Sequence, residues 1–180
     1  DEASTSRVVQ QRWDADGRKV FESYPLRSIA AFNTSVYGQS DTYDWIGRPY
    51  RHYQDGENGL LTTSTDYLSG FQRRVTNPRG YATTTAFFAL DEPGAAAVAS
   101  LSAPEGVSTS IQRNVFGQPV SVTRSGPGPG GTVSATRSYV YDAWRRLCKT
   151  LEPERGATVQ AYDTAGNVSW SASGQNLDRK

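Results

Sequence analysis

The sequence has few of the residues that build catalytic and metal sites. Its 180 residues include one histidine, one cysteine and no methionine. A single cysteine excludes an intrachain disulfide framework. One histidine and one cysteine cannot supply the usual ligand set of a zinc site. We therefore expect no metal centre and no bound cofactor.

The chain also lacks a surplus of one charge and any long apolar run. Nineteen Lys and Arg balance 18 Asp and Glu for a net charge of +1, and the cations are scattered, so nucleic-acid binding is not expected. No stretch of about 18 apolar residues predicts a membrane span. The first residues, "DEASTSRVV", have no signal-peptide pattern. With no methionine at all, we interpret the chain as a piece of a longer protein.

Aromatic residues and glycine are plentiful. The chain has 4 Trp, 10 Tyr, 6 Phe and 17 Gly, although only 36% of its residues are hydrophobic. That hydrophobic share is low for a packed globule, but the aromatics supply more apolar surface than a disordered chain has. The composition therefore favours polar strands joined by many turns.

A motif of an aromatic residue, Asp, two variable residues and Gly recurs along the chain. The clearest copy is "YDTAGN", and "YDWIGR" and "WDADGR" are others. We align seven degenerate units, about 21 to 30 residues apart. The glycine position is occupied by Gly17, Gly47, Gly70, Glu92, Gly117, Arg145 and Gly166. The unit at Gly70 fits worst, because its tyrosine, Tyr67, comes one place late.

The other positions of the motif are filled consistently. Four places before the glycine position stand the aromatics Trp13, Tyr43, Phe88, Tyr141 and Tyr162. Three places before it stand Asp14, Asp44, Asn114, Asp142 and Asp163. Directly after it stand Arg18, Arg48, Gln118, Arg146 and Asn167.

Each position has a structural reason. The aspartate can accept a hydrogen bond from the backbone N–H two residues on. The glycine can take a positive φ, which closes a type I turn as a bulged hairpin. The aromatic residue can pack across to a facing strand. Arg145 breaks this rule, and the sequence leaves open whether it is left-handed or the local turn differs.

Clusters of Gly and Pro alternate with these motifs and predict a second set of turns. They are "QDGENG" (54–59), "NPRG" (77–80), "APEG" (103–106), "SGPGPGG" (125–131) and "EPERG" (152–156). Segments rich in Val, Thr, Ser and Tyr lie between the turns and predict strands. They include 18–24, 71–76, 107–113, 118–124, 132–141 and 157–162. The one candidate helix, 93–101, is short. The prediction is an all-β, antiparallel meander of hairpins.

These motifs resemble those of the Rhs, or YD-repeat, family. The best matches are Tyr139 to Val168 and "YDWIGRP", and the resemblance covers roughly residues 12–172. It implies that residues 1–180 are a fragment, about seven repeats long, of a spiralling β-shell with no separate catalytic or toxin domain. The family's self-cleaving protease segment has no counterpart in this sequence.

The resemblance also implies a function. In bacterial Rhs toxins and in the C subunits of insecticidal toxin complexes, the shell encloses a C-terminal effector. In wall-associated proteins, related repeats lie at the cell surface. We expect a secreted or cell-surface bacterial protein that is not an enzyme and whose partners are an effector in cis and the rest of the shell. The alternative is a surface module that binds carbohydrate or a partner.

The few candidate sites have simpler structural interpretations. His52 lies in an expected strand, and no G-x-S-x-G elbow accompanies it. The acidic pairs Asp55/Glu57, Asp91/Glu92 and Glu152/Glu154 lie in or beside turns. Cys148 is expected to be a partly buried strand residue. The glycine-rich segment 125–131 lacks the end of a phosphate loop, and we interpret it as a flexible turn.

One carboxylate per turn makes calcium binding a minor possibility, because calcium needs several converging oxygens. The tryptophans are the strongest binding candidates, because exposed indole rings could stack on sugars. We favour instead that they pack in cross-strand ladders. These four residues are Trp13, Trp45, Trp144 and Trp170. No catalytic, cofactor-binding or metal-binding residue is therefore assigned.

Overall fold

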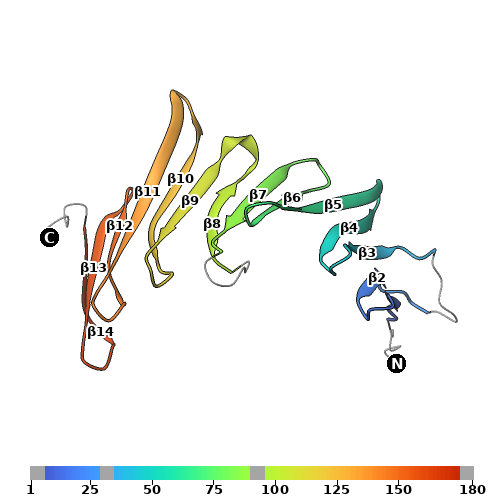
Figure 1. Cartoon of the computed structure of the whole chain (residues 1–180), viewed down its shortest axis with the longest axis horizontal. Coiled ribbons are helices and arrows are strands. Elements are labelled where there is room, and N and C mark those ends of the chain that lie inside the picture. Colours follow the sequence, from blue (N-terminus) through green and yellow to red (C-terminus); the bar gives the residue numbers. More distant parts are fainter. Residues whose placement is uncertain (1–6, 29–34, 90–95, 175–180) are drawn as a thin grey trace, which may run out of the picture. The chain divides into compact units, whose positions relative to one another are not determined.

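A computed structural model describes residues 7–28, 35–89 and 96–174 of the chain. Its strands follow one another in the sheet in chain order, each antiparallel to the next wherever a register is defined (Figure 1). The described residues form no α-helix, and one short 3₁₀ turn, η1, spans Pro104–Gly106. The prediction of an all-β fold built from antiparallel hairpins is confirmed.

The chain divides into two compact units. The first comprises Asp1–Leu68 and Arg73–Ala82. Its strands are β1 (Gln11–Trp13), β2 (Lys19–Ser23), β3 (Gly38–Tyr43), β4 (Pro49–Gly56), β5 (Gly59–Leu68) and most of β6 (Gln72–Thr76). The register pairs Phe21 with Ser40, and Ser40 in turn with Tyr53.

The second unit comprises Ser69–Gln72 and Thr83–Lys180. Most of β7 (Ala82–Phe87) belongs to it, and it continues through β8 (Val98–Ser102), β9 (Ser108–Arg113), β10 (Pro119–Gly128), β11 (Gly131–Tyr141), β12 (Leu147–Glu152), β13 (Gly156–Tyr162) and β14 (Val168–Gly174). The longest hairpin joins β10 to β11, with eight residue pairs from Ser121↔Ser138 to Gly128↔Gly131.

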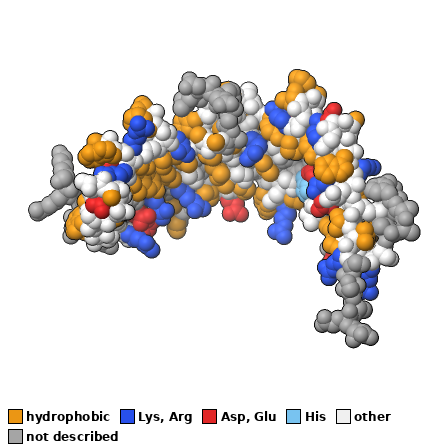
Figure 2. All heavy atoms as spheres, turned by 90° about the horizontal axis from the view of Figure 1, so that it is seen from below, with side chains coloured by type: hydrophobic (Ala, Val, Ile, Leu, Met, Phe, Trp, Pro, Cys, Tyr) orange, Lys and Arg blue, Asp and Glu red, His pale blue; other side chains and the backbone are white. Residues whose placement is uncertain are grey.

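In each unit the sheet is a single layer without a hydrophobic core. Neither a helix nor a second sheet covers a face of the described strands (Figure 1). Ala157, at 2% exposure, is the one buried hydrophobic residue among them, and Gln10 and Ser23 are buried polar residues. Hydrophobic side chains lie at the surface instead (Figure 2). Contacts between neighbouring strands must therefore supply most of the stability of each unit.

The strands predicted from the sequence are all present, but two predicted segments differ. The candidate helix 93–101 is wrong where the structure describes it, because Val98–Leu101 belong to strand β8; residues 93–95 lie outside the described part. The glycine-rich segment 125–131 is not a turn over its whole length. Strand β10 runs on to Gly128, since pairing with β11 continues through Ser125, Gly126 and Pro127 despite their low strand propensity.

Candidate functional site: the clamp between neighbouring turns

The recurring motif forms one turn, which we call the aspartate turn. At Asp163, the Gly166 N–H donates to the Asp163 carbonyl at 3.1 Å, and the Asp163 N–H donates to the Asn167 carbonyl at 2.9 Å. The Asp163 Oδ1 accepts the backbone N–H groups of Ala165 and Asn167, both at 2.9 Å. The predicted bond two residues on is confirmed, and the bond four residues on adds to it.

The same hydrogen bonds recur in four of the other copies, whereas the Gly70 copy is a different turn, in which Gly70 and Phe71 have φ values of +71° and +55°. The bonds form at Asp14, Asp44, Asn114 and Asp142. They also form at Asn77, where the Arg79 and Tyr81 N–H groups donate to the Asn77 Oδ1 at 3.0 Å. The sequence analysis placed residues 77–80 in the second set of turns, those rich in Gly and Pro. This turn therefore has the same hydrogen bonds as the aspartate turns, although it was predicted to be of the other kind. The copy at Glu92 lies outside the described residues.

The glycine position is left-handed in these turns. φ is +87° at Gly166 and +76° at Gly17. Arg145 is left-handed in the same kind of turn, because its φ is +65° and its hydrogen bonds match those of the glycine copies. This answers the question that the sequence left open. The strand register also shifts at the aromatic residue, for example between Ala161 and Tyr162. The predicted bulged hairpin is confirmed.

In three turns, the arginine directly after the glycine position forms an ion pair with the aspartate of the same turn. The Arg Nε donates to Asp Oδ2 at 2.7 Å in the Arg18–Asp14 pair, 2.8 Å in Arg48–Asp44 and 2.7 Å in Arg146–Asp142. The guanidinium then lies over the tyrosine ring of the following hairpin. The distances to the ring centroid are 4.9 Å for Arg18 over Tyr43, 4.0 Å for Arg48 over Tyr67 and 4.5 Å for Arg146 over Tyr162.

That tyrosine completes the link between hairpins. Its hydroxyl donates to the carbonyl two residues past the glycine position of the preceding aspartate turn. The bonds run from Tyr43 to Lys19, Tyr67 to Pro49 and Tyr162 to Leu147, at 2.8 to 2.9 Å. Tyr141 makes the same bond to Pro119 at 2.9 Å, although the preceding turn has Asn114 and Gln118 in place of the aspartate and the arginine. We call each set of aspartate, arginine and following tyrosine the clamp. Tyr67 occupies its place in a clamp although it is one residue late in the motif.

The hydrogen bonds also set the charge state of the aspartates. The backbone N–H four residues on is the main cause that lowers the pKa of Asp14 and of Asp163. Partial burial alone would raise the pKa of Asp44 and Asp142, but hydrogen bonds from the following arginine outweigh it and lower both pKa values. The ionised carboxylate is thus the form that each clamp holds.

The chemistry of the clamp is structural. Each aspartate accepts two backbone N–H groups and one side chain, which leaves little capacity to take a proton from a substrate. The clamp instead joins successive hairpins through charge-assisted hydrogen bonds and a cation–π contact, where no core is available. The sequence predicted the roles of the aspartate and the glycine, but the hydrogen bond of the tyrosine hydroxyl was not predicted. The signal that could have indicated this bond is the preference for Tyr over Phe at the aromatic position.

The other candidates lie apart from one another. The Nδ1 of His52, on β4, lies 2.8 Å from the Asp41 Oδ1 on β3. Cys148 is half-buried on β12, as expected. Glu152 lies 3.6 Å from the Nε of Arg137. Among the described residues, no group of three His, Cys, Asp or Glu could hold a metal ion. The pair Asp91/Glu92 lies outside that part.

The tryptophans do not behave as predicted. Trp45 and Trp144 lie in aspartate turns and are 92% and 76% exposed, so the prediction of cross-strand packing is wrong for both. Trp45 follows Asp44 directly, and Trp144 comes two residues after Asp142. Trp13 and Trp170 lie in β1 and β14 and are 56% and 55% exposed.

No family model matches the chain, and no curated protein is significantly similar to it. In the described part of the chain, no helix has the length and apolar character that crossing a membrane requires.

Proposed function

We propose that this chain is a wall segment of a bacterial YD-repeat shell of the Rhs type, which encloses a C-terminal effector. The observation that carries the proposal is the repeated clamp. It joins hairpin to hairpin along the chain direction and needs no core. A sheet built this way can be extended by further hairpins of the same kind, as a container wall requires.

The open faces of the sheet agree with this role. A wall has one face toward solvent and one toward its contents, so neither face needs to pack against a second layer of the same chain. The proposal places the protein outside the bacterial cell or at its surface, gives it no catalytic role, and names the effector and the rest of the shell as its partners.

Two experiments test the proposal. The complete reading frame should continue the aspartate-turn repeats and end in a segment without them. In the intact parent protein that C-terminal segment should resist a protease that digests it when it is expressed alone. Flanks without repeats, or equal digestion in both forms, would contradict the proposal.

A second candidate, carbohydrate binding at the cell surface, has the exposed indole rings of Trp45 and Trp144 in its favour, since flat exposed rings can stack on sugars. A glycan array of the parent chain and of Trp45→Ala and Trp144→Ala tests it, with Trp170→Ala as the control on a strand. Binding that only the turn variants lose supports this candidate, and a parent chain that binds no glycan ends it.

A further inference from the structure

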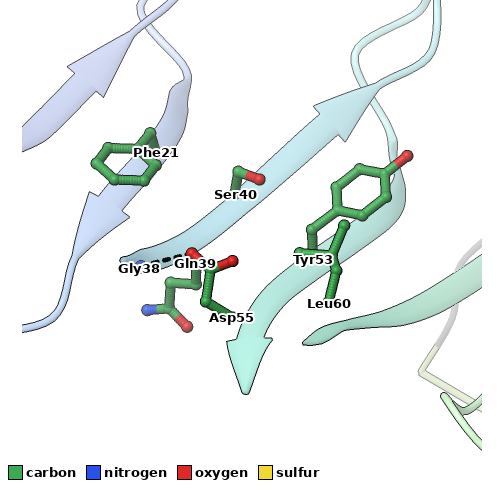
Figure 3. Close-up of a pocket in the computed structure, with 7 residues that line it drawn as sticks. All are labelled: Phe21, Gly38, Gln39, Ser40, Tyr53, Asp55 and Leu60. Carbon is green, nitrogen blue, oxygen red and sulfur yellow. Dashed lines mark hydrogen bonds between the residues drawn. The ribbon is translucent and has the colours of Figure 1, made fainter. Parts of the chain in front are cut away.

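A trough runs along strand β3 in the first unit, on one face of the sheet (Figure 3). Phe21 of β2 and Tyr53 of β4 form its walls, and Ser40 of β3 lies between them in the same row of the register. Because adjacent strands lie about 4.8 Å apart, the backbones that carry the two rings are roughly 10 Å apart. A small residue on the middle strand therefore leaves room for a flat group between the walls.

Gly38 keeps the next position of the trough empty. A Cβ on this residue would come within 2.2 Å of the Glu22 carbonyl oxygen, so the close approach of β2 and β3 excludes any side chain here. The Gly38 N–H donates to the Asp55 Oδ2 at 2.9 Å, which draws the carboxylate toward the trough (Figure 3). The Tyr24 hydroxyl donates to the Asp55 carbonyl at 2.6 Å and holds the backbone in place.

In the part of the chain that the structure describes, no cation pairs with the carboxylate of Asp55. Among the described residues, its one hydrogen bond is that from Gly38. Arg51 lies on the same strand, but its Nη1 is 3.7 Å from Asp66 and donates to the Tyr50 carbonyl. Lys19, on β2, pairs with Glu22 at 2.6 Å. Arg51 and Lys19 are thus engaged by other groups.

The trough has the components of the clamp except the arginine. In a clamp, a carboxylate that accepts a backbone N–H also binds a guanidinium, and the guanidinium lies over a tyrosine ring. In the trough, Asp55 accepts the Gly38 N–H and the Tyr53 ring lies two residues away on the same face of β4. A carboxylate beside two aromatic faces favours a cationic ligand over a neutral one. A planar cation fits best between two rings.

We propose that this trough binds the guanidinium of an arginine side chain presented by an extended segment of a partner polypeptide. The guanidinium donates to the free side of the Asp55 carboxylate and stacks between Phe21 and Tyr53, above Ser40. The proposal does not depend on the shell function, because it concerns a site on one face whatever that face encloses.

The probe is the peptide acetyl-Gly-Arg-Gly-amide, and its matched control carries citrulline, which has the same shape without the charge. Binding is followed through the NMR amide signal of Gly38. Asp55→Asn should weaken binding about tenfold, because it removes one charge from a charged hydrogen bond. Ser40→Leu should abolish it by filling the trough. Asp41→Asn, on the opposite face of β3, should leave it unchanged.

Arginine-specific binding that responds to both trough variants supports the proposal. Equal binding of the citrulline peptide, stronger binding of a neutral hexose at the same residues, or parent-like binding by Ser40→Leu would overturn it. If the Asp55→Asn variant loses the β-sheet circular dichroism spectrum, the Ser40→Leu variant alone tests the proposal, since the leucine side chain projects into the open trough and should not disturb the fold.

Discussion

Gly166→Ala tests whether the aspartate turn requires a left-handed residue. Its φ is +87°, and a Cβ built there meets no atom within 4 Å. The substitution therefore adds no steric clash, and its effect is that of the backbone conformation alone. A left-handed L-residue costs about 1 to 2 kcal/mol, which the lower entropy of the unfolded alanine chain offsets in part. We expect a net destabilisation of about 1 kcal/mol, or roughly 2 to 4 °C in Tm for a chain of this size.

The assay is urea and thermal unfolding by circular dichroism, together with hydrogen exchange of the Asn167 amide. The exchange measurement matters because a repeat sheet can open locally. Ala165→Ser is the control, since this neighbouring residue has no positive φ. Unchanged stability together with unchanged exchange at Asn167 would refute the reasoning.

Arg145 provides the reciprocal test, since it already occupies the left-handed position at φ +65°. Its guanidinium lies 4.4 Å from the Phe116 ring centroid, a contact of about 0.5 to 1 kcal/mol at an exposed site. Both Arg145→Gly and Arg145→Ala lose this contact, but only glycine relieves the backbone. The glycine variant should therefore be more stable than the alanine variant by about 1 kcal/mol. Equal stability of the two would count against a strained turn.

Three further predictions concern the clamp and the exposed rings. Tyr162→Phe keeps the ring over Arg146 but removes the hydroxyl bond to Leu147 and the bond that the hydroxyl accepts from Gln160. It should therefore destabilise the last hairpins by about 1 kcal/mol in urea unfolding, and parent-like unfolding would contradict a stabilising role for these bonds. The folded pKa of Asp14 is lowered, so its contribution is present above the unfolded pKa and is lost as pH falls through the folded one; Asp14→Asn should therefore lower Tm at pH 7 and have little effect at pH 2, and an equal effect at both would contradict this. Trp45→Ala should leave Tm unchanged because the ring is 92% exposed, and a loss of several degrees would show a packing role.

Much of this protein follows from local sequence alone. Asp163 and Gly166 determine a turn through hydrogen bonds and backbone angles that span only five residues, so the turn and the all-β hairpin order are readable without a structure. The same locality explains why five of the six strand segments listed from the sequence have nearly correct ends, with β10 as the exception.

Tertiary structure decided what depends on neighbouring strands. The Tyr162 hydroxyl meets the Leu147 carbonyl 15 residues earlier, and no local pattern specifies that partner. Pairing with β11 extends β10 through a segment whose glycines and proline predict a turn. The trough beside Asp55 exists only because three strands place Phe21, Ser40 and Tyr53 in one row. The sequence alone thus determined the turns and the order of hairpins, whereas register between strands, a property of distant residues, decided the clamps and the trough.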